Sequence, residues 1–524
     1  MSGHWVEVAK AGELASKSVK LVKAAGKQIA LFKNESGLFA CNNRCPHEGY
    51  PLSEGSLSGC VLTCNWHNWK FDLASGETLT GGDRLRRYPT RIENGAVFVD
   101  VADPPAAERR ATALAALAEA FRRHDSDRMA RELARLTAAG GSLESAILAA
   151  LERSHERFEF GMSHAQAAAA DWLLLGERFA TNEAEKLVPA VEILAHLSWD
   201  TLREPAFPYP TALAEWNADA LAEAIEAEDE ERAVALLRGA IEANVSWREI
   251  EAPLARAALA HYQDFGHAAI YVVKAGELMA RLGNSLRLSV LLPLVRGLIY
   301  ANREDLIPEF RDYRPALEAW DGRGDAPVAA EDFAALGVKQ VLARALESSG
   351  DVKALYRALF GAAARSLLQF DIALQERSDN PVGQNVGWLD FTHAVTFGDA
   401  ARQLAERQPG LWPAALLQLA CFAGRNAGFH DRDIDVDQWR VDDAEGFFET
   451  HYRRLFDHGQ REHIVAAHLI KTLGAAESAI AADSQAPFVP DLLAALNRFL
   501  HSPLKRRHAL REARQALAFV VAEG

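Results

Sequence analysis

Residues 45–47 read Cys-Pro-His and residues 64–67 read Cys-Asn-Trp-His, so a C-x-H element is followed about sixteen residues later by a C-x-x-H element. Two thiols and two imidazoles presented by two loops can hold a metal centre through two sulfur and two nitrogen ligands. A zinc ribbon, the alternative for such a cluster, normally uses C-x-x-C pairs, alone or with a histidine pair. The spacing therefore favours a mixed sulfur and nitrogen centre other than a zinc ribbon.

The sequence around this motif predicts a compact antiparallel β domain, because from Trp5 to about Val101 short alternating apolar runs are separated by Gly, Asn and Pro. The motif and the stretches at 42–49, 51–55 and 69–76 resemble Rieske [2Fe-2S] ferredoxin domains over roughly residues 4 to 101. The resemblance implies one-electron transfer, with no substrate chemistry at the cluster. It assigns four cluster ligands: Cys45, His47, Cys64 and His67.

Composition excludes several classes of protein. The chain has 524 residues, 49% of them hydrophobic, and a net charge of −15, so a nucleic-acid partner would meet a repulsive field. No apolar run approaches the roughly twenty residues of a membrane span, and four of the five cysteines crowd into about twenty-five residues, which indicates a metal site in a reducing compartment. We therefore expect a cytoplasmic protein that binds neither nucleic acid nor a membrane.

After Asp103-Pro-Pro the pattern changes to helical spacing, which predicts a Rieske domain over 1–104 and an all-helical domain over 105–524. The helical part contains an internal repeat, since the segment 119–164 recurs as 223–267 with an offset of about 104 residues. Diverged third and fourth copies run through 355–393 and 447–471. Each copy carries a histidine at an equivalent place, namely His164, His267, His393 and His468.

Four repeat-equivalent histidines predict a shared metal site, because imidazole is a common ligand of iron, zinc and copper; packing preserved between repeats is the alternative. Asp264 and Asp390 each begin a D-F-x-H unit, where the carboxylate could accept the second N–H of the imidazole or itself bind metal. Glu152 and His155 form the E-x-x-H spacing of carboxylate-bridged di-iron bundles, which leaves a di-iron site open.

In the fourth copy Lys471 lies three residues after His468, on the same helix face. Four histidines on repeated helices with an inward lysine resemble the questin oxidase family over roughly 108–524. That resemblance implies a non-haem Fe(II) held by the four histidines and by a carboxylated lysine at position 471. His463 competes with His468 for the fourth place, and Lys274 competes with Lys471. A fused Rieske domain is not part of that family's pattern.

Together these features predict a Rieske-fused non-haem iron oxygenase. A flavin-dependent NAD(P)H reductase or a ferredoxin reductase would reduce the [2Fe-2S] cluster, and the cluster would pass electrons to an iron that activates O2 to oxidise an apolar cyclic or aromatic small molecule. Lys471, Asp264 and Asp390 are the candidate catalytic residues. The alternatives are an electron-transfer protein with a helical docking domain and no second metal, or a di-iron hydroxylase. The sequence is compatible with mono-oxygenation, ring cleavage and Baeyer-Villiger insertion alike.

Overall fold

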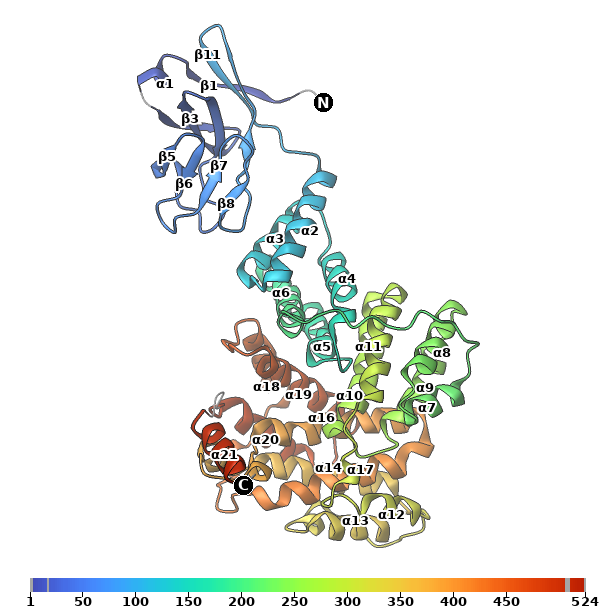
Figure 1. Ribbon diagram of the computed structural model, residues 1–524. Helices are drawn as coiled ribbons and strands as arrows, with labels where there is room; N and C mark the ends of the chain where they lie inside the picture. The colour runs from blue at the N-terminus through green and yellow to red at the C-terminus, as the bar shows by residue number, and fades with distance from the viewer. Residues whose placement is uncertain (1–2, 17, 505–508, 523–524) are drawn as a thin grey trace. The chain divides into compact units, whose positions relative to one another are not determined.

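A computed structural model describes residues 3–16, 18–504 and 509–522 and contains two compact units, Met1–Leu143 and Glu144–Gly524 (Figure 1). The division falls later than the boundary expected at residue 104. Helices α2 (Ala106–Arg123) and α3 (Ser126–Ala138) pack against each other and belong to the first unit, with the β domain. Each unit is described separately below.

The expected antiparallel β domain is confirmed and consists of three small sheets. The first pairs β1 (Trp5–Lys10), β11 (Ala96–Asp100) and β10 (Thr90–Glu93). The second pairs β2 (Val19–Ala24), β3 (Lys27–Asn34), β4 (Gly37–Asn42) and β9 (Arg87–Tyr88). The third pairs β5 (Ser56–Ser58), β6 (Val61–Thr63), β7 (Lys70–Asp72) and β8 (Thr78–Thr80). Both faces of β3 and β4 are buried: Ile29, Leu31 and Ala40 belong to one apolar cluster, and Ala30, Phe32 and Cys41 to a second cluster on the opposite face.

The second unit confirms the large helical region. Its first half contains α4 (Leu143–Ser154), which begins at the unit boundary, then α5 (His164–Phe179), α6 (Glu183–Asp200), α7 (Ala218–Glu226), α8 (Glu230–Glu242), α9 (Trp247–Ala258), α10 (His267–Leu282) and α11 (Arg287–Ile299). Its second half contains α12 (Tyr313–Glu318), α13 (Val338–Glu347), α14 (Val352–Leu368), α15 (Ala373–Glu376), α16 (Trp388–Arg407), α17 (Trp412–Asn426), α18 (Ala444–Leu455), α19 (His463–Ala482), α20 (Val489–His501) and α21 (Ala509–Ala522).

Helices α3 to α6 and α8 to α11 follow the same order at nearly constant offset, in line with the sequence repeat. The local signals repeat as well. Asp125 caps α3 by accepting the backbone N–H of Arg128, and Asp229 caps α8 by accepting that of Arg232. His164 and His267 are both the first residue of their helix, α5 and α10.

Four helices form a closed ring at the centre of the second unit: α5 contacts α10 and α19, and α16 contacts the same two helices. Helix α19 is long and apolar enough to cross a membrane by length and composition, but 67% of its apolar window is buried inside the protein. A helix that is apolar on every side is expected in a protein core. The ring therefore buries the middle of each helix, and it places one repeat histidine on each.

Candidate metal centres

The two ligand loops of the β domain have matching backbone geometry. In the first loop the Cys45 N–H donates to the Tyr50 carbonyl (2.8 Å), and in the second the Cys64 N–H donates to the Trp69 carbonyl (2.7 Å). Each loop turns through a left-handed residue four positions after its cysteine, Gly49 (φ 79°) and Asn68 (φ 60°), a conformation that Gly and Asn adopt most readily. Two similar turns therefore present two similar ligand pairs.

The four predicted ligands line one cavity of about 160 Å³. The rings of His47 and His67 lie 4.7 Å apart, edge to face. Cys45 and Cys64 are buried, and burial raises the pKa of the Cys45 thiol to about 11. A cationic cluster would reverse this shift, because a coordinating thiol is deprotonated. The donors, the cavity and the turns fit a [2Fe-2S] cluster held by Cys45, His47, Cys64 and His67.

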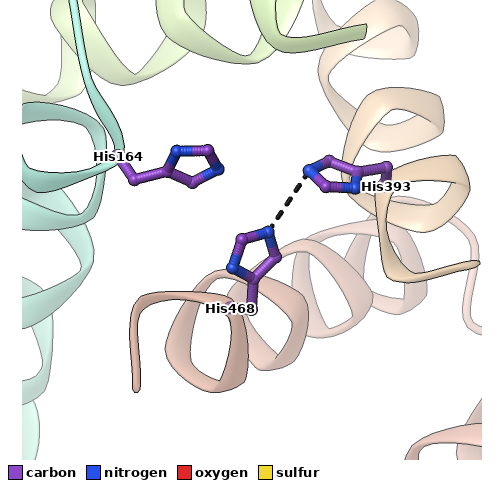
Figure 2. Close-up of side chains that lie close together, drawn as sticks. All are labelled: His164, His393 and His468. Atoms are coloured by element: carbon purple, nitrogen blue, oxygen red, sulfur yellow. Dashed lines mark hydrogen bonds between the residues drawn. The ribbon is translucent and has the colours of Figure 1, made fainter. Parts of the chain in front are cut away.

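The second unit brings all four repeat histidines together through their Nε2 atoms. His267 Nε2 lies 3.0 Å from His164 Nε2 and 2.9 Å from His393 Nε2, and His468 Nε2 lies 3.2 Å from His393 Nε2. Figure 2 shows three of these rings, His164, His393 and His468, directed toward one another from separate helices. The ring of α5, α10, α16 and α19 thus closes around four imidazole nitrogens.

Backbone contacts decide which ring nitrogen of two histidines carries the proton. His267 Nδ1 lies 2.5 Å from the Asp264 carbonyl, and His468 Nδ1 lies 2.7 Å from the Ile464 carbonyl. Because a carbonyl oxygen only accepts hydrogen bonds, both Nδ1 atoms carry the hydrogen and both Nε2 atoms present a lone pair to the centre. Lone pairs that converge in a core repel one another unless a cation binds them, so the arrangement fits a metal ion.

The electrostatics of the site keep the imidazoles neutral. Burial lowers the pKa of His267 to about 3, and burial lowers the pKa values of the other three, His164, His393 and His468, well below the ordinary range. Neutral imidazole is the form that binds metals. The chemistry of this donor set suits iron, zinc or copper.

The two competing lysines have different environments. Lys274 is ion-paired with Asp171 (2.8 Å) and Glu277 (3.0 Å). Lys471 is 1% exposed, and its Nζ has no hydrogen-bond partner among the described residues. Burial lowers the pKa of Lys471 to about 8. Lys471 is therefore the amine that loses its proton more easily and makes no hydrogen bond among the described residues, whereas Lys274 is held by two carboxylates.

The two aspartates of the D-F-x-H units do not hold the imidazoles in the expected way. The backbone carbonyl of Asp264, not its carboxylate, accepts the His267 N–H, and the carboxylate lies 3.9 Å away. Asp390 instead caps α16 by accepting the Gly387 N–H (2.8 Å) and pairs with Arg425 (3.1 Å). At Asp390 the carboxylate bonds a free backbone N–H at the start of the helix, whereas at Asp264 the backbone carbonyl takes the place expected for the carboxylate.

The other alternative ligands lie outside the four-histidine centre. His463 Nδ1 is 3.8 Å from Glu192, and its ring stacks on His196. His458, which shares Glu192 with His463, donates from Nε2 toward that carboxylate (3.4 Å), because its Nδ1 accepts the Gln460 N–H. His155 bonds the Glu152 carbonyl and stacks on Tyr209. Among the described residues, no carboxylate joins the converging histidines as a di-iron site would require.

A cavity of about 380 Å³ lies beside the histidines. Its apolar wall includes Met162 and Leu298, and its polar wall includes Asp264 and Asn302. Tyr271 joins this cavity to the four histidines, because it lines the cavity while its hydroxyl lies 3.2 Å from His164 Nδ1. The sequence alone did not distinguish Tyr271 from aromatic residues of the core. Its position one helical turn after His267, on the same helix face, could have indicated that it lies near the histidines.

The turn that carries Asp264 into this cavity is strained. Asp264, Phe265 and Gly266 all have positive φ (47°, 53° and 79°), and the first two are unusual for side chains with a Cβ. Glu304 stabilises the turn, because its carboxylate accepts the Phe265 N–H (3.1 Å). Burial raises the pKa of Asp264, and it raises the pKa of Glu304 to about 7.

The raised pKa of Glu304 predicts a pH-dependent stability. Because the folded state holds the proton more tightly than the unfolded chain, the stabilisation is complete below about pH 4.5 and is lost as pH rises through about 7. Glu304→Gln keeps the acceptor and removes the charge. From pH 5 to 8 wild type should lose up to about 3 kcal/mol of unfolding free energy relative to Glu304→Gln, measured by urea unfolding. The exposed Glu309→Gln is the control, and an equal difference there would contradict the assignment.

The β domain and its paired Cys and His loops define an iron–sulfur electron-transfer domain, and comparisons with known proteins agree. The Rieske [2Fe-2S] domain family matches residues 4–89. Over 121 residues the chain is 37% identical to the 4beta-methylsterol monooxygenase of Methylococcus capsulatus, covering 21% of this chain and 33% of that protein. Over 103 residues it is 30% identical to the naphthalene 1,2-dioxygenase system ferredoxin component of Pseudomonas putida, covering 19% of this chain and 99% of that protein.

A solved complex of reduced oxygenase and oxidized ferredoxin in carbazole 1,9a-dioxygenase aligns at 23% identity, covering 20% of this chain and 98% of that chain, with a TM-score of 0.19. Through residues 4–89 the chain belongs to the Rieske [2Fe-2S] family. It spans a third of the methylsterol monooxygenase, and these alignments cover about a fifth of the chain itself. These alignments do not cover most of the helical unit, so its role is inferred from its own geometry.

Proposed function

We propose that this protein is an O2-dependent oxidoreductase in which the Rieske cluster passes single electrons to one non-haem iron in the helical unit. His164, His267, His393 and His468 would hold that iron. A bound Fe(II) supplies the one-electron chemistry that O2 activation needs. The electron donor would be a flavin-dependent NAD(P)H reductase or a ferredoxin reductase, and the substrate an apolar cyclic or aromatic molecule.

The observation that carries the proposal is the convergence of four neutral imidazoles, two with their lone pairs directed to one point, in a chain that also holds a one-electron carrier. The names of two relatives of the β domain, a methylsterol monooxygenase and the ferredoxin component of a naphthalene dioxygenase system, support a role in oxygenation. The absence of converging carboxylates in the described residues favours one iron over two.

The cavity beside the histidines would bind the substrate. Its size of about 380 Å³ lies within the usual range for small-molecule sites, and its apolar wall would exclude water from the reacting molecule. The Asp264 carboxylate and the Tyr271 hydroxyl would orient the polar end of the substrate. Both groups are fixed, Asp264 by the turn that Glu304 stabilises and Tyr271 by its contact with His164.

Filling this cavity should impair substrate use and spare the metal. Ala301 lies in the cavity wall at its partly exposed side, so Ala301→Trp adds an indole without opening the core. We expect KM for an accepted substrate to rise at least about tenfold, with iron content unchanged. Leu306→Trp, at a 71% exposed position outside the cavity wall, is the matched control. Unaltered kinetics in Ala301→Trp would place the substrate elsewhere.

Lys471 would serve as a fifth ligand in carbamate form. The ammonium first loses one proton; the neutral amine then adds to CO2 through a new N–C bond and releases a second proton, which leaves an anionic oxygen donor in place of a cation. The geometry supports this role, because the Lys471 Nζ is buried without a hydrogen-bond partner among the described residues and burial lowers its pKa to about 8. A permanently charged ammonium beside a metal ion would instead weaken metal binding.

Lys471→Met should therefore have two opposite effects. Removing a buried amine that makes no hydrogen bond among the described residues should raise the unfolding free energy of the metal-free protein by about 1–2 kcal/mol. Losing the carbamate should lower iron affinity at least about tenfold. Competitive chelation and urea unfolding measure the two effects, and ¹³C-bicarbonate should give wild type a carbonyl resonance that Lys471→Met lacks. Unchanged iron affinity would exclude lysine ligation.

The stoichiometry of iron and acid-labile sulfide tests the central proposal without a known substrate. An anaerobically prepared chain should contain about three irons and two sulfides, two irons in the cluster and one in the helical unit. Two irons with two sulfides and no other metal would indicate a Rieske electron carrier with a helical docking unit. Four irons with two sulfides would indicate a di-iron enzyme.

A further inference from the structure

We propose that helix α3 is a functional part of the Rieske domain, and that Asp83, held by two arginines of α3, is a positioning residue that keeps Trp69 stacked on the cluster ligand His47 and so sets the reduction potential. The proposal rests on the [2Fe-2S] cluster alone. It is therefore independent of whether the helical unit holds iron.

Trp69 connects the two ligand loops. Its indole stacks on the His47 imidazole of the first loop, with ring centroids 4.4 Å apart and planes 10° apart. Its carbonyl accepts the Cys64 N–H and closes the second loop. The His47 side chain is 25% exposed, so the indole keeps water from one face of a ligand that is otherwise accessible.

The backbone of Gly81 lies against the Trp69 indole. Gly81 has φ 121°, and a Cβ at this position would lie 2.3 Å from the indole, so only glycine allows such a close approach. The next residue, Gly82, faces α3, since a Cβ there would lie 3.2 Å from the Arg128 side chain. The loop 81–82 is therefore a thin layer of backbone between Trp69 and α3.

Asp83 attaches this glycine loop to α3. Its side chain is fully buried, and Arg131 donates to both of its oxygens (3.2 and 2.7 Å), while Arg135 donates to one of them. The two arginines lower the pKa of Asp83 despite its burial. Two adjacent glycines have little conformational preference of their own. The buried ion pairs therefore determine where the loop, and with it the indole, lies.

The stack affects the cluster through solvation. Reduction adds one negative charge to the cluster, and water stabilises added charge better than an indole does. Loosening Trp69 would let water reach His47 and would favour the reduced state. The reduction potential should therefore rise when any link from α3 to Asp83, to Gly81 or to Trp69 is broken.

The test is an anaerobic redox titration of the full-length, cluster-loaded protein, followed by circular dichroism of the cluster. Asp83→Asn weakens the ion pairs with Arg131 and Arg135. Gly81→Ala displaces the Trp69 indole and leaves both ion pairs in place. Both, like Trp69→Leu, should raise the equilibrium constant for cluster reduction three- to tenfold, roughly 30 to 60 mV for one electron. Asp103→Asn is the matched control, because Asp103 is also held by two cations, Arg86 and Lys27. Its potential should stay at the wild-type value.

Two results would overturn the proposal. If Trp69→Leu shifts the potential while Asp83→Asn and Gly81→Ala lower only the thermal midpoint, the α3 contact is merely structural. If none of the three shifts the potential, the indole does not tune the cluster. Should Asp83→Asn fail to fold, Arg131→Gln offers a milder change that leaves Arg135 on Asp83. Since neither O2 nor substrate is used, failure here is distinguishable from failure of the proposed oxidoreductase activity.

Discussion

Replacing His267 by alanine should remove the iron of the helical unit and abolish O2-dependent turnover while the Rieske cluster remains. His267 links two of the other imidazoles, since its Nε2 lies 3.0 Å from His164 Nε2 and 2.9 Å from His393 Nε2. Even residues that only orient metal ligands usually contribute 10- to 100-fold to metal affinity. We therefore expect the loss of a direct ligand to weaken iron binding at least about a hundredfold.

The measurement is iron and sulfide per chain in His267→Ala, which should fall from about three irons to two with two sulfides retained. His463→Ala is the control, because His463 lies beside Glu192 and His196 and not at the centre. The visible spectrum of the cluster reports that the first unit is intact, and far-ultraviolet circular dichroism reports the helices. Full iron content and turnover in His267→Ala would mean that His267 is not a ligand of the iron.

The double substitution Cys45→Ala with Cys64→Ala should have the reverse effect, losing the cluster and keeping the helical iron. The two buried thiols are the predicted sulfur ligands, and the remaining imidazoles, His47 and His67, would not hold a [2Fe-2S] unit without them. About one iron and no acid-labile sulfide should remain per chain. O2 consumption driven by NAD(P)H and a reductase should fall at least about a hundredfold, because electrons no longer have a carrier.

Cys60→Ala is the matched control for this prediction, since Cys60 precedes Cys64 by four residues and does not line the cluster cavity. It should retain the cluster spectrum and the rate of O2 consumption. Continued NAD(P)H-driven turnover by the double variant would show that the reductase supplies the helical unit directly. Loss of all iron in the double variant would instead leave the second unit without a metal.

The features that could be predicted from the sequence are those encoded by local spacing. Cys45, His47, Cys64 and His67 lie on two short loops, and their separation alone allows one metal centre. The four repeat histidines could be predicted because a repeat places equivalent residues at equivalent positions in the fold. The same logic did not reveal that the Asp390 carboxylate bonds the Gly387 N–H and Arg425, or that the Asp264 backbone carbonyl, not its carboxylate, accepts the His267 N–H.

The amino-acid sequence by itself determined the β domain, the two Cys and His loops that fit the cluster, the helical remainder and the identity of the four histidines, because each depends on contacts between residues near in sequence or on periodic repetition. Only the tertiary structure decided that His468 rather than His463 reaches the other three histidines, and that Lys274 is ion-paired whereas Lys471 makes no hydrogen bond among the described residues. It alone showed that α2 and α3 belong with the β domain and that Tyr271 joins a cavity to the four histidines. These contacts join residues distant in sequence, and they depend on which helix faces meet, which residue spacing does not specify.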